Sequence, residues 1–255
     1  MRDRSRSSSI RTKRSSHRSR AAQKPSWTCR AVLRELRSLG EARNVEGMAR
    51  FGIVSKAQVL GVAKPRMDAL ARKIGTNRTL ALQLWRTSVH DARILAGMID
   101  EPVEVTASQM EQWVRGFDNW DVCDGTCCHL FVFCEPAWRK AIEWSRRDAE
   151  FVKRAGFALM AYLAYRDKNA SDLKFLRLLP MIEREADDER NFVRKAVNWA
   201  LRNIGKRNLR LNCAALRTAA RIRRRDSRAA RWIAADAIRE LRSEAVQRRL
   251  RRKAG

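Results

Sequence analysis

Trp120 and Asp124 form the most suggestive pair of side chains in the chain, within the stretch FDNWDVCD. They are four residues apart, and on a helix that spacing places both side chains on one face, about 40° from each other. An aromatic plate beside a carboxylate can contact a sugar ring and stabilise a positive charge that develops there. A buried tryptophan beside an aspartate that caps a helix would show the same spacing. The spacing alone leaves both interpretations open.

Two other segments contain residues suited to a cleft. Arg154 stands early in a predicted helix among small residues, where it could hold a phosphate, pair with a carboxylate or face solvent. Trp199 lies between cationic residues, as do aromatic side chains that contact nucleic acid. Its position in the apolar pattern nevertheless favours a core tryptophan.

Four of the six cysteines lie within residues 123–134, beside His129. Their spacing lacks the paired Cys-x2-Cys arrangement of a structural zinc site, so we interpret them as buried free thiols. The three histidines are too scattered for a metal triad, and His90 is expected to make a polar contact between helices. The sequence therefore predicts no metal and no cofactor. Reduced thiols and the lack of a secretory signal favour a cytoplasmic, nucleoid-associated protein.

The pattern from Trp27 onward is helical nearly everywhere. Glycine and proline are sparse, at 11 and 5 of 255 residues, and apolar side chains recur at helical spacing, as in Phe192, Ala196 and Trp199. Thr106 and Gln109 have the spacing of a capping box. About a dozen short-linked helices, in pairs of 30–40 residues, predict an all-α fold: a HEAT-like αα-hairpin repeat superhelix, or α-α solenoid, with a concave basic groove. A compact helical bundle is the alternative.

The charge indicates a polyanionic partner. The formal net charge is +27, of which residues 1–25 contribute +8 and residues 26–255 the remaining +19. We interpret residues 1–25 as a disordered Arg/Ser-rich arm that either tracks DNA or has no role, and residues 26–255 as one helical domain. The basic run from Arg217 to Lys253 is either a DNA-facing helix pair or a solvated face. No apolar run approaches a membrane span, so no membrane partner is expected.

Five short segments, in this order, resemble the AlkD-type DNA alkylation repair family of HEAT-like glycosylases. The resemblance extends from about residue 47 to 241, and the segments that carry it are residues 48–53, 85–93, 120–124, 151–155 and 191–202. A family tyrosine near the N-terminus of the cleft has no match in this chain. Met48 or Phe51 falls at that place instead.

The resemblance implies roles for single residues. Asp124 would be the catalytic carboxylate, and Arg154 would grip the DNA backbone. Trp120 and Trp199 would form aromatic walls against the deoxyribose. Further candidates for the cleft are Lys153, Arg190 and Arg194.

The implied activity is that of a monofunctional glycosylase in base excision repair. It would hydrolyse the N-glycosidic bond of cationic N3- or N7-alkylated purines in duplex DNA, without a lysine Schiff base, and act as a monomer. Asp124 would stabilise the oxocarbenium-like sugar. The alternatives are a non-catalytic HEAT-like nucleic-acid-binding paralogue and a HEAT-like protein scaffold.

Overall fold

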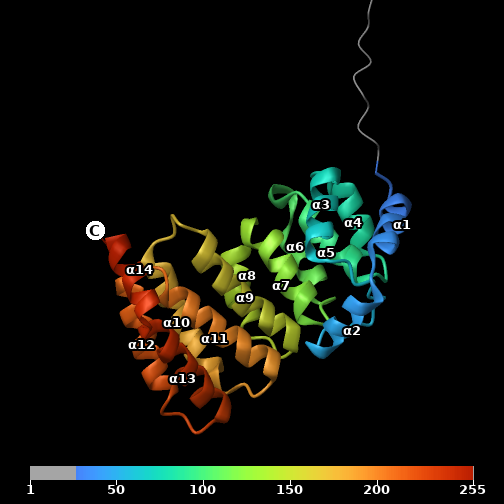
Figure 1. Ribbon diagram of the computed structural model, residues 1–255. Coiled ribbons are helices and arrows are strands. Elements are labelled where there is room, and N and C mark those ends of the chain that lie inside the picture. Colours follow the sequence, from blue (N-terminus) through green and yellow to red (C-terminus); the bar gives the residue numbers. More distant parts are fainter. Residues whose placement is uncertain (1–26, 255) are drawn as a thin grey trace, which may run out of the picture.

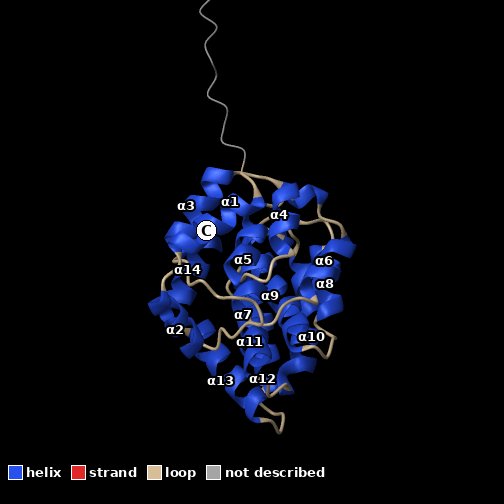
Figure 2. Cartoon of the chain, turned by 90° about the vertical axis from the view of Figure 1, so that its right-hand side faces the viewer, coloured by secondary structure: helices blue, strands red, loops and turns tan. Residues whose placement is uncertain are grey.

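A computed structural model describes residues 27–254, and the predicted arm at residues 1–25 lies outside this range. The described residues are helical almost throughout (Figures 1 and 2). Three short 3-10 helices, at Pro102–Glu104, Phe131–Phe133 and Glu185–Asp187, interrupt the α-helices. The α-helices are α1 (Cys29–Leu39), α2 (Ala42–Arg50), α3 (Lys64–Ile74), α4 (Arg78–Trp85), α5 (His90–Ile99), α6 (Ala107–Val114), α7 (Trp120–His129), α8 (Ala137–Trp144), α9 (Glu150–Arg166), α10 (Asp172–Arg184), α11 (Asn191–Gly205), α12 (Leu209–Ile222), α13 (Arg228–Arg242) and α14 (Glu244–Ala254).

The helices follow one another across the molecule in sequence order, from α1 on the right of Figure 1 to α14 on the left. Successive helices pack as hairpins, such as α4 with α5, α8 with α9 and α12 with α13. One member of each hairpin joins a continuous row formed by α5, α7, α9, α11 and α13, in which each helix packs against the next. This arrangement confirms the prediction of an all-α HEAT-like repeat.

Polar contacts between neighbouring hairpins show the length of the repeat, which the weak sequence identity between hairpins does not show. The Arg154 side chain donates a hydrogen bond to the Phe192 carbonyl, and the Asn198 side chain donates one to the Asp236 carboxylate. The two residues of each pair are 38 positions apart. Arg202 and Glu240 form an ion pair across the same interval. The spacing falls within the predicted 30–40 residues, because each hairpin presents equivalent positions to its neighbour. Among the described helices, none is long and apolar enough to cross a membrane.

The predicted capping box at the start of α6 is half formed. The Thr106 hydroxyl accepts a hydrogen bond from the Gln109 backbone N–H at 3.1 Å, as a helix cap should. The Gln109 side chain does not return to Thr106. Its amide donates instead to the buried carboxylate of Asp100 at 2.6 Å. The bond to Asp100 therefore replaces the bond from the Gln109 side chain back to Thr106 that would complete a capping box.

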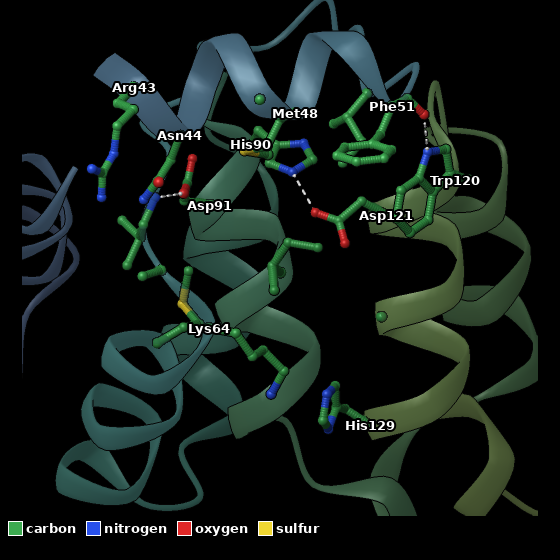
Figure 3. A pocket seen from close by; sticks show the side chains of 17 residues that line it. Arg43, Asn44, Met48, Phe51, Lys64, His90, Asp91, Trp120, Asp121 and His129 are labelled. Carbon is green, nitrogen blue, oxygen red and sulfur yellow. Dashed lines mark hydrogen bonds and ion pairs between the residues drawn. The ribbon is translucent and has the colours of Figure 1, made fainter. Parts of the chain in front are cut away.

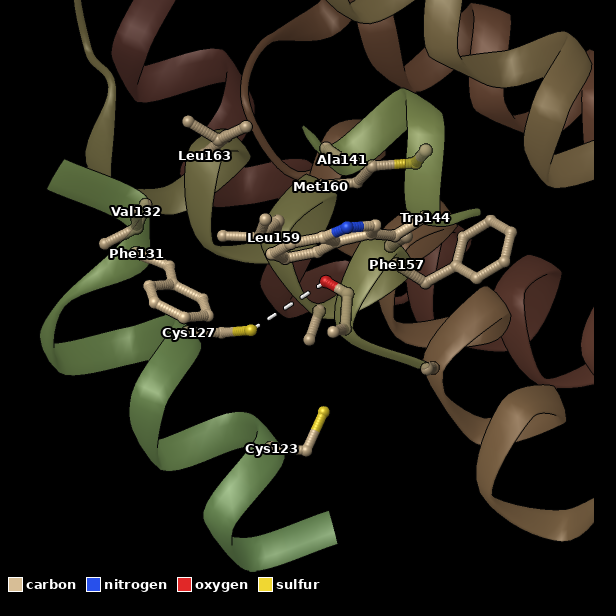
Figure 4. Packing of buried hydrophobic residues seen from close by; sticks show 14 of the residues in the cluster. Cys123, Cys127, Phe131, Val132, Ala141, Trp144, Phe157, Leu159, Met160 and Leu163 are labelled. Atoms are coloured by element: carbon tan, nitrogen blue, oxygen red, sulfur yellow. Dashed lines mark hydrogen bonds between the residues drawn. The ribbon is translucent and has the colours of Figure 1, made fainter. Parts of the chain in front are cut away.

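Apolar side chains fill much of the interface between α7 and α9, which contains two of the cysteines (Figure 4). The thiols of Cys123 and Cys127 face the backbone carbonyls of Phe151 and Ala155, and burial raises the pKa of Cys123 well above its ordinary value. Cys134 is buried as well. The prediction of buried free thiols is confirmed for these three residues, whereas Cys128 is partly exposed.

Gly156 allows α9 to lie unusually close to the end of α8. A Cβ atom at this position would stand 2.5 Å from the Ser145 backbone nitrogen. That distance is shorter than any side chain tolerates, so the absence of a side chain sets the separation of the two helices. Because Gly156 is two residues from Arg154, the same contact positions the segment that carries the arginine.

Candidate active site

The first turn of α7 presents Trp120 and Asp124 on one face. Asn119 caps this helix, because its side-chain oxygen accepts the backbone N–H groups of Asp121 and Val122 at 3.0 and 3.1 Å. The cap is therefore an asparagine, and the Asp124 carboxylate is free for another partner. Trp120 and Asp124 are both partly exposed. The alternative of a buried tryptophan beside a capping aspartate does not describe this helix.

Asp124 forms a two-pronged ion pair with Arg154 of α9. The arginine Nε donates to one carboxylate oxygen at 2.9 Å and a terminal nitrogen donates to the other at 2.6 Å. The second terminal nitrogen of Arg154 donates to the Phe192 carbonyl of α11 at 2.6 Å. The side chains are 15% exposed for Asp124 and 8% for Arg154. This fork fixes the carboxylate in one orientation and joins three consecutive helices of the row.

A contact of Arg154 with the DNA backbone stays a prediction, and the geometry of this ion pair favours a different role. A guanidinium that grips the DNA backbone must reach solvent, but this one is almost covered and already bound to a carboxylate and a carbonyl. Of the interpretations open from the sequence, pairing with a carboxylate is the one that the structure shows. Arg154 therefore positions Asp124.

Burial and the ion pair act in opposite directions on the acidity of Asp124. Burial raises the pKa of this carboxyl above its ordinary value, and the neighbouring Arg154 guanidinium limits the rise by stabilising the carboxylate. Burial would lower the pKa of Arg154, but the Asp124 carboxylate outweighs that effect and raises it. The arginine thus favours the charged form of the carboxylate.

Tyr162 connects this ion pair to Trp199, the second predicted aromatic residue. The rings of Tyr162 and Trp199 meet edge to face with their centroids 4.8 Å apart, and both residues are partly exposed. Burial, and then the nearby charge of Asp124, raise the pKa of Tyr162. None of the sequence motifs described above predicts a functional role for Tyr162. Its position eight residues after Arg154, on the same face of α9, is the signal that could have identified it.

The segment that follows α2 reaches the site from the other side. The indole nitrogen of Trp120 donates to the Phe51 carbonyl at 3.0 Å (Figure 3). Gly52 touches the ring of Phe192, and a Cβ atom there would stand 2.8 Å from the ring. The Phe51 ring is 76% exposed beside Trp120. Phe51 therefore occupies the edge of the site, at the place where the family resemblance expected a tyrosine.

A cavity of about 530 Å³ lies beneath α2 and shares Trp120 with this site. Met48 of α2 and Phe51, the residue after this helix, line it, and Lys64 and His129 lie at its far end (Figure 3). Asp121, and not Asp124, lines this cavity. α7 therefore separates the cavity from the ion pair, with Trp120 at the boundary.

His90 makes a polar contact between helices, as the sequence predicted, and the neighbouring Asp91 holds the segment that precedes α3. The His90 ring nitrogen lies 3.1 Å from an Asp121 carboxylate oxygen on α7, and the histidine is 1% exposed. The Asp91 carboxylate accepts the backbone N–H groups of Leu60 and Val62 at 2.7 and 2.8 Å. Both residues brace the helices around the cavity.

The three additional cleft candidates are engaged elsewhere. Lys153 is buried, and its ammonium group pairs with Glu185 at 2.6 Å and Asp188 at 3.5 Å. Arg190 pairs with Asp188 at 2.5 Å and donates to the Asp148 carbonyl. The expectation that Lys153 or Arg190 lines the cleft stays a prediction, and it is one that these ion pairs do not favour, because acidic partners already hold both side chains.

Arg194 lies farther along α11, over the ring of Trp232 at 4.8 Å from its centroid. Trp232 belongs to α13 and is 39% exposed. The arginine keeps a partly exposed edge beside an exposed aromatic ring. Among Lys153, Arg190 and Arg194, it is the one whose position still suits contact with a ligand.

Comparisons with known proteins agree with this architecture. The family model described as DNA alkylation repair enzyme matches residues 32–241. A solved structure is similar to this chain, with a TM-score of 0.70 and 23% sequence identity. The matched region covers 88% of this chain and 96% of the chain in that structure. That protein comes from a family described as related to the HEAT-like repeat DNA glycosylases, with affinity for branched DNA structures. None of the curated proteins compared with the chain matches its sequence. Since the family model spans most of the sequence, the chain belongs to the DNA alkylation repair enzyme family.

Proposed function

We propose that the chain is a DNA glycosylase that hydrolyses the N-glycosidic bond of cationic N3- or N7-alkylated purines in duplex DNA. The observation that carries this proposal is the partly exposed Asp124 carboxylate, which Arg154 holds on the same face of α7 as Trp120 and close enough to Tyr162 for its charge to act on that residue. A single oriented carboxylate among aromatic rings is the arrangement that stabilises a sugar cation. The net charge of +19 outside the arm supports DNA as the ligand.

Departure of the alkylated base needs no strong acid catalysis from the protein. Alkylation at N3 or N7 gives the purine a positive charge, so the base departs with the bonding electrons as a neutral molecule. The deoxyribose is left as an oxocarbenium-like cation, which the Asp124 carboxylate stabilises electrostatically. Water then adds to the anomeric carbon, and its proton is released to the carboxylate or to solvent. The products are the free base and an abasic site.

The placement of Lys153 supports a monofunctional reaction. A Schiff-base mechanism requires an amine next to the anomeric carbon, but the Lys153 ammonium pairs with Glu185 and Asp188. Arg154, which adjoins the carboxylate, stays protonated and is no nucleophile. Hydrolysis is therefore the reaction that these side chains favour.

A glycosylase assay on duplex DNA containing 7-methylguanine or 3-methyladenine tests the proposal. The wild-type chain should release the methylated base, and Asp124→Asn should lower the single-turnover rate by about a hundredfold or more. Binding to the same duplex should change only a few-fold. Asp121→Asn is a matched control on the same turn of α7, and it should retain most of the activity. Normal turnover by Asp124→Asn would refute the assignment.

A second candidate function is DNA binding without catalysis. The observation that favours it is the structural similarity to a protein whose family is described as having affinity for branched DNA structures. Under this alternative the wild-type chain would release no base from either lesion, yet would bind DNA with a strong dependence on salt. The same assay therefore separates the two candidates.

A further inference from the structure

A cationic hollow lies at the C-terminal ends of α9 and α11, beside α14, which packs against α12 and α13. It has a volume of about 670 Å³. Its lining contains five basic side chains and no acidic one, and these five are Lys168, Lys206, Arg207, Arg249 and Lys253. Such a hollow concentrates positive potential in a concave space, which favours an anionic ligand.

Two of the five cations are structural. Lys206 pairs with Glu240 at 2.6 Å. Arg207 donates to the carbonyls of Ala164 and Asp167 at 2.9 and 2.8 Å, so it caps the end of α9. The Lys253 ammonium in turn donates to the Arg207 carbonyl at 3.2 Å, which holds α14 over the hollow. These contacts give the hollow a fixed floor.

The other three cations have no neutralising partner. Lys168, Arg249 and Lys253 form no ion pair within residues 27–254. Partial burial, and then the like charges of Arg249, Lys168 and Arg207, lower the pKa of Lys253. Mutual repulsion of this kind is relieved when an anion with several oxygen atoms enters between the cations.

An exposed aromatic ring stands at the edge of the hollow. Tyr165 is 61% exposed, with the Lys168 ammonium 5.0 Å and the Arg166 guanidinium 5.5 Å from its ring centroid. The exposed ring and these two cations together present an aromatic surface next to positive charge. Aromatic rings next to backbone-binding cations are the arrangement by which proteins stack unpaired bases.

We propose that this hollow binds the phosphates of a single-stranded nucleic-acid segment, with one unpaired base stacked on Tyr165. Lys168, Arg249 and Lys253 contact the phosphates. The site differs from the ion pair of Asp124 and Arg154, and it is completed by α14, which lies beyond the residues that the family model matches. It rests on the proposed function only in taking nucleic acid as the ligand.

Fluorescence anisotropy with two undamaged DNA probes tests this inference on the full chain. One probe is a blunt duplex, and the other is the same duplex with a single-stranded thymidine extension. The wild-type chain should bind the extended probe about tenfold more tightly than the blunt duplex, because one stacked base and its phosphates add to the binding. Lys168→Ala/Arg249→Ala and Tyr165→Ala should each lose most of this gain while binding the blunt duplex nearly as before.

The matched control is Arg210→Ala/Arg217→Ala, which removes two exposed cations from α12. It should keep the gain from the extension. For the extended probe, the double variant in the hollow should also reduce the slope of log affinity against log salt by about 1.4, the value for two phosphate contacts on a single strand. Thermal unfolding of every variant verifies that it folds.

Two results would overturn the inference: an extension that gives the wild-type chain no gain, or an equal loss in the α12 control. Base release distinguishes this failure from failure of the proposed function. If the chain is no glycosylase, the gain from the extension persists. If the hollow does not bind a strand, release of the methylated base is unaffected.

Discussion

The guanidinium of Arg154 forms a bidentate ion pair with the carboxylate of Asp124, and its two hydrogen bonds of 2.9 and 2.6 Å join α9 to α7. This contact links the chemistry of the site to its packing, because the same arginine also holds the Phe192 carbonyl of α11. These contacts lead us to propose that Arg154 stabilises the carboxylate rather than recognising a phosphate.

Replacement of Arg154 should therefore shift the pH dependence of base release. In the proposed reaction Asp124 acts as a carboxylate, so activity should be present above the pKa of Asp124 and be lost as the pH falls through it. Burial already raises that pKa, and the loss of the cation raises it further. In Arg154→Gln, the acid limb of kcat/KM should move upward by about one pH unit or more.

The controls for this shift are a conservative variant and a distant arginine. Arg154→Lys keeps a positive charge beside the carboxylate and should leave the acid limb close to that of the wild-type chain. Arg177→Gln, on an exposed position of α10, should have no effect. An unchanged acid limb in Arg154→Gln would show that the arginine does not set the ionisation of Asp124.

Removal of the Lys153 ammonium should destabilise the fold without weakening DNA binding. Lys153→Met removes the cation that Glu185 and Asp188 share, and leaves each of these partly buried carboxylates with one arginine, Arg184 or Arg190. The loss should cost about 1 to 2 kcal/mol in the free energy of unfolding. Adding Glu185→Gln should recover part of that loss. Denaturant unfolding measures both effects. If the folded Lys153→Met chain bound duplex DNA much more weakly, Lys153 would be a DNA contact after all.

The same cluster should lose stability in acid. Burial works to raise the pKa of Glu185, but its bonds with Lys153 and Arg184 outweigh burial and lower it. A lowered carboxyl pKa contributes stability that is fully present above the pKa of an unfolded glutamate, about 4.3, and is lost as the pH falls through the lowered value. Unfolding midpoints measured from neutral pH downward should therefore fall less steeply in Glu185→Gln than in the wild-type chain.

A methyl group on Gly156 should push α9 away from α8. The added Cβ atom would lie 2.5 Å from the Ser145 nitrogen, so we expect Gly156→Ala to cost about 2 kcal/mol in unfolding free energy and to reduce activity through displacement of Arg154. Gly47→Ala is the matched control, because nothing lies within 4 Å of its added carbon in the middle of α2. It should be neutral or stabilising by up to about 1 kcal/mol. Equal stability of the two variants would refute the close approach.

The edge-to-face contact between Tyr162 and Trp199 should appear as a coupling energy. In a double-mutant cycle with Tyr162→Leu and Trp199→Leu, unfolding experiments should give a coupling of about 1 kcal/mol. Tyr162→Phe keeps the ring and should behave like the wild-type chain in stability. A coupling near zero would mean that the rings do not support each other, and that Trp199 is positioned by the rest of α11.

The pairing of helices, the site on α7 and the buried thiols could be predicted from local patterns. Helical periodicity fixes which face of a segment is apolar, and the four-residue spacing of Trp120 and Asp124 fixes their common face. The partners of the cations could not be predicted in this way. Lys153 and Arg154 are adjacent in sequence, yet one faces Glu185 and the other Asp124, because neighbouring helical positions point about 100° apart. The 38-residue contacts between hairpins also involve residues whose types carry no visible repeat.

The interval of 38 residues between contacts has a consequence for how the molecule comes apart. Since each hairpin is tied mainly to the next, fraying that begins at α1 or α14 must pass through several interfaces before it reaches α7 and α9. The Asp124 carboxylate lies near the centre of this row of helices, so fraying at either end of the molecule leaves its surroundings folded. Damage at α9, by contrast, would divide the molecule into two unsupported halves at the very helix that holds the carboxylate in place.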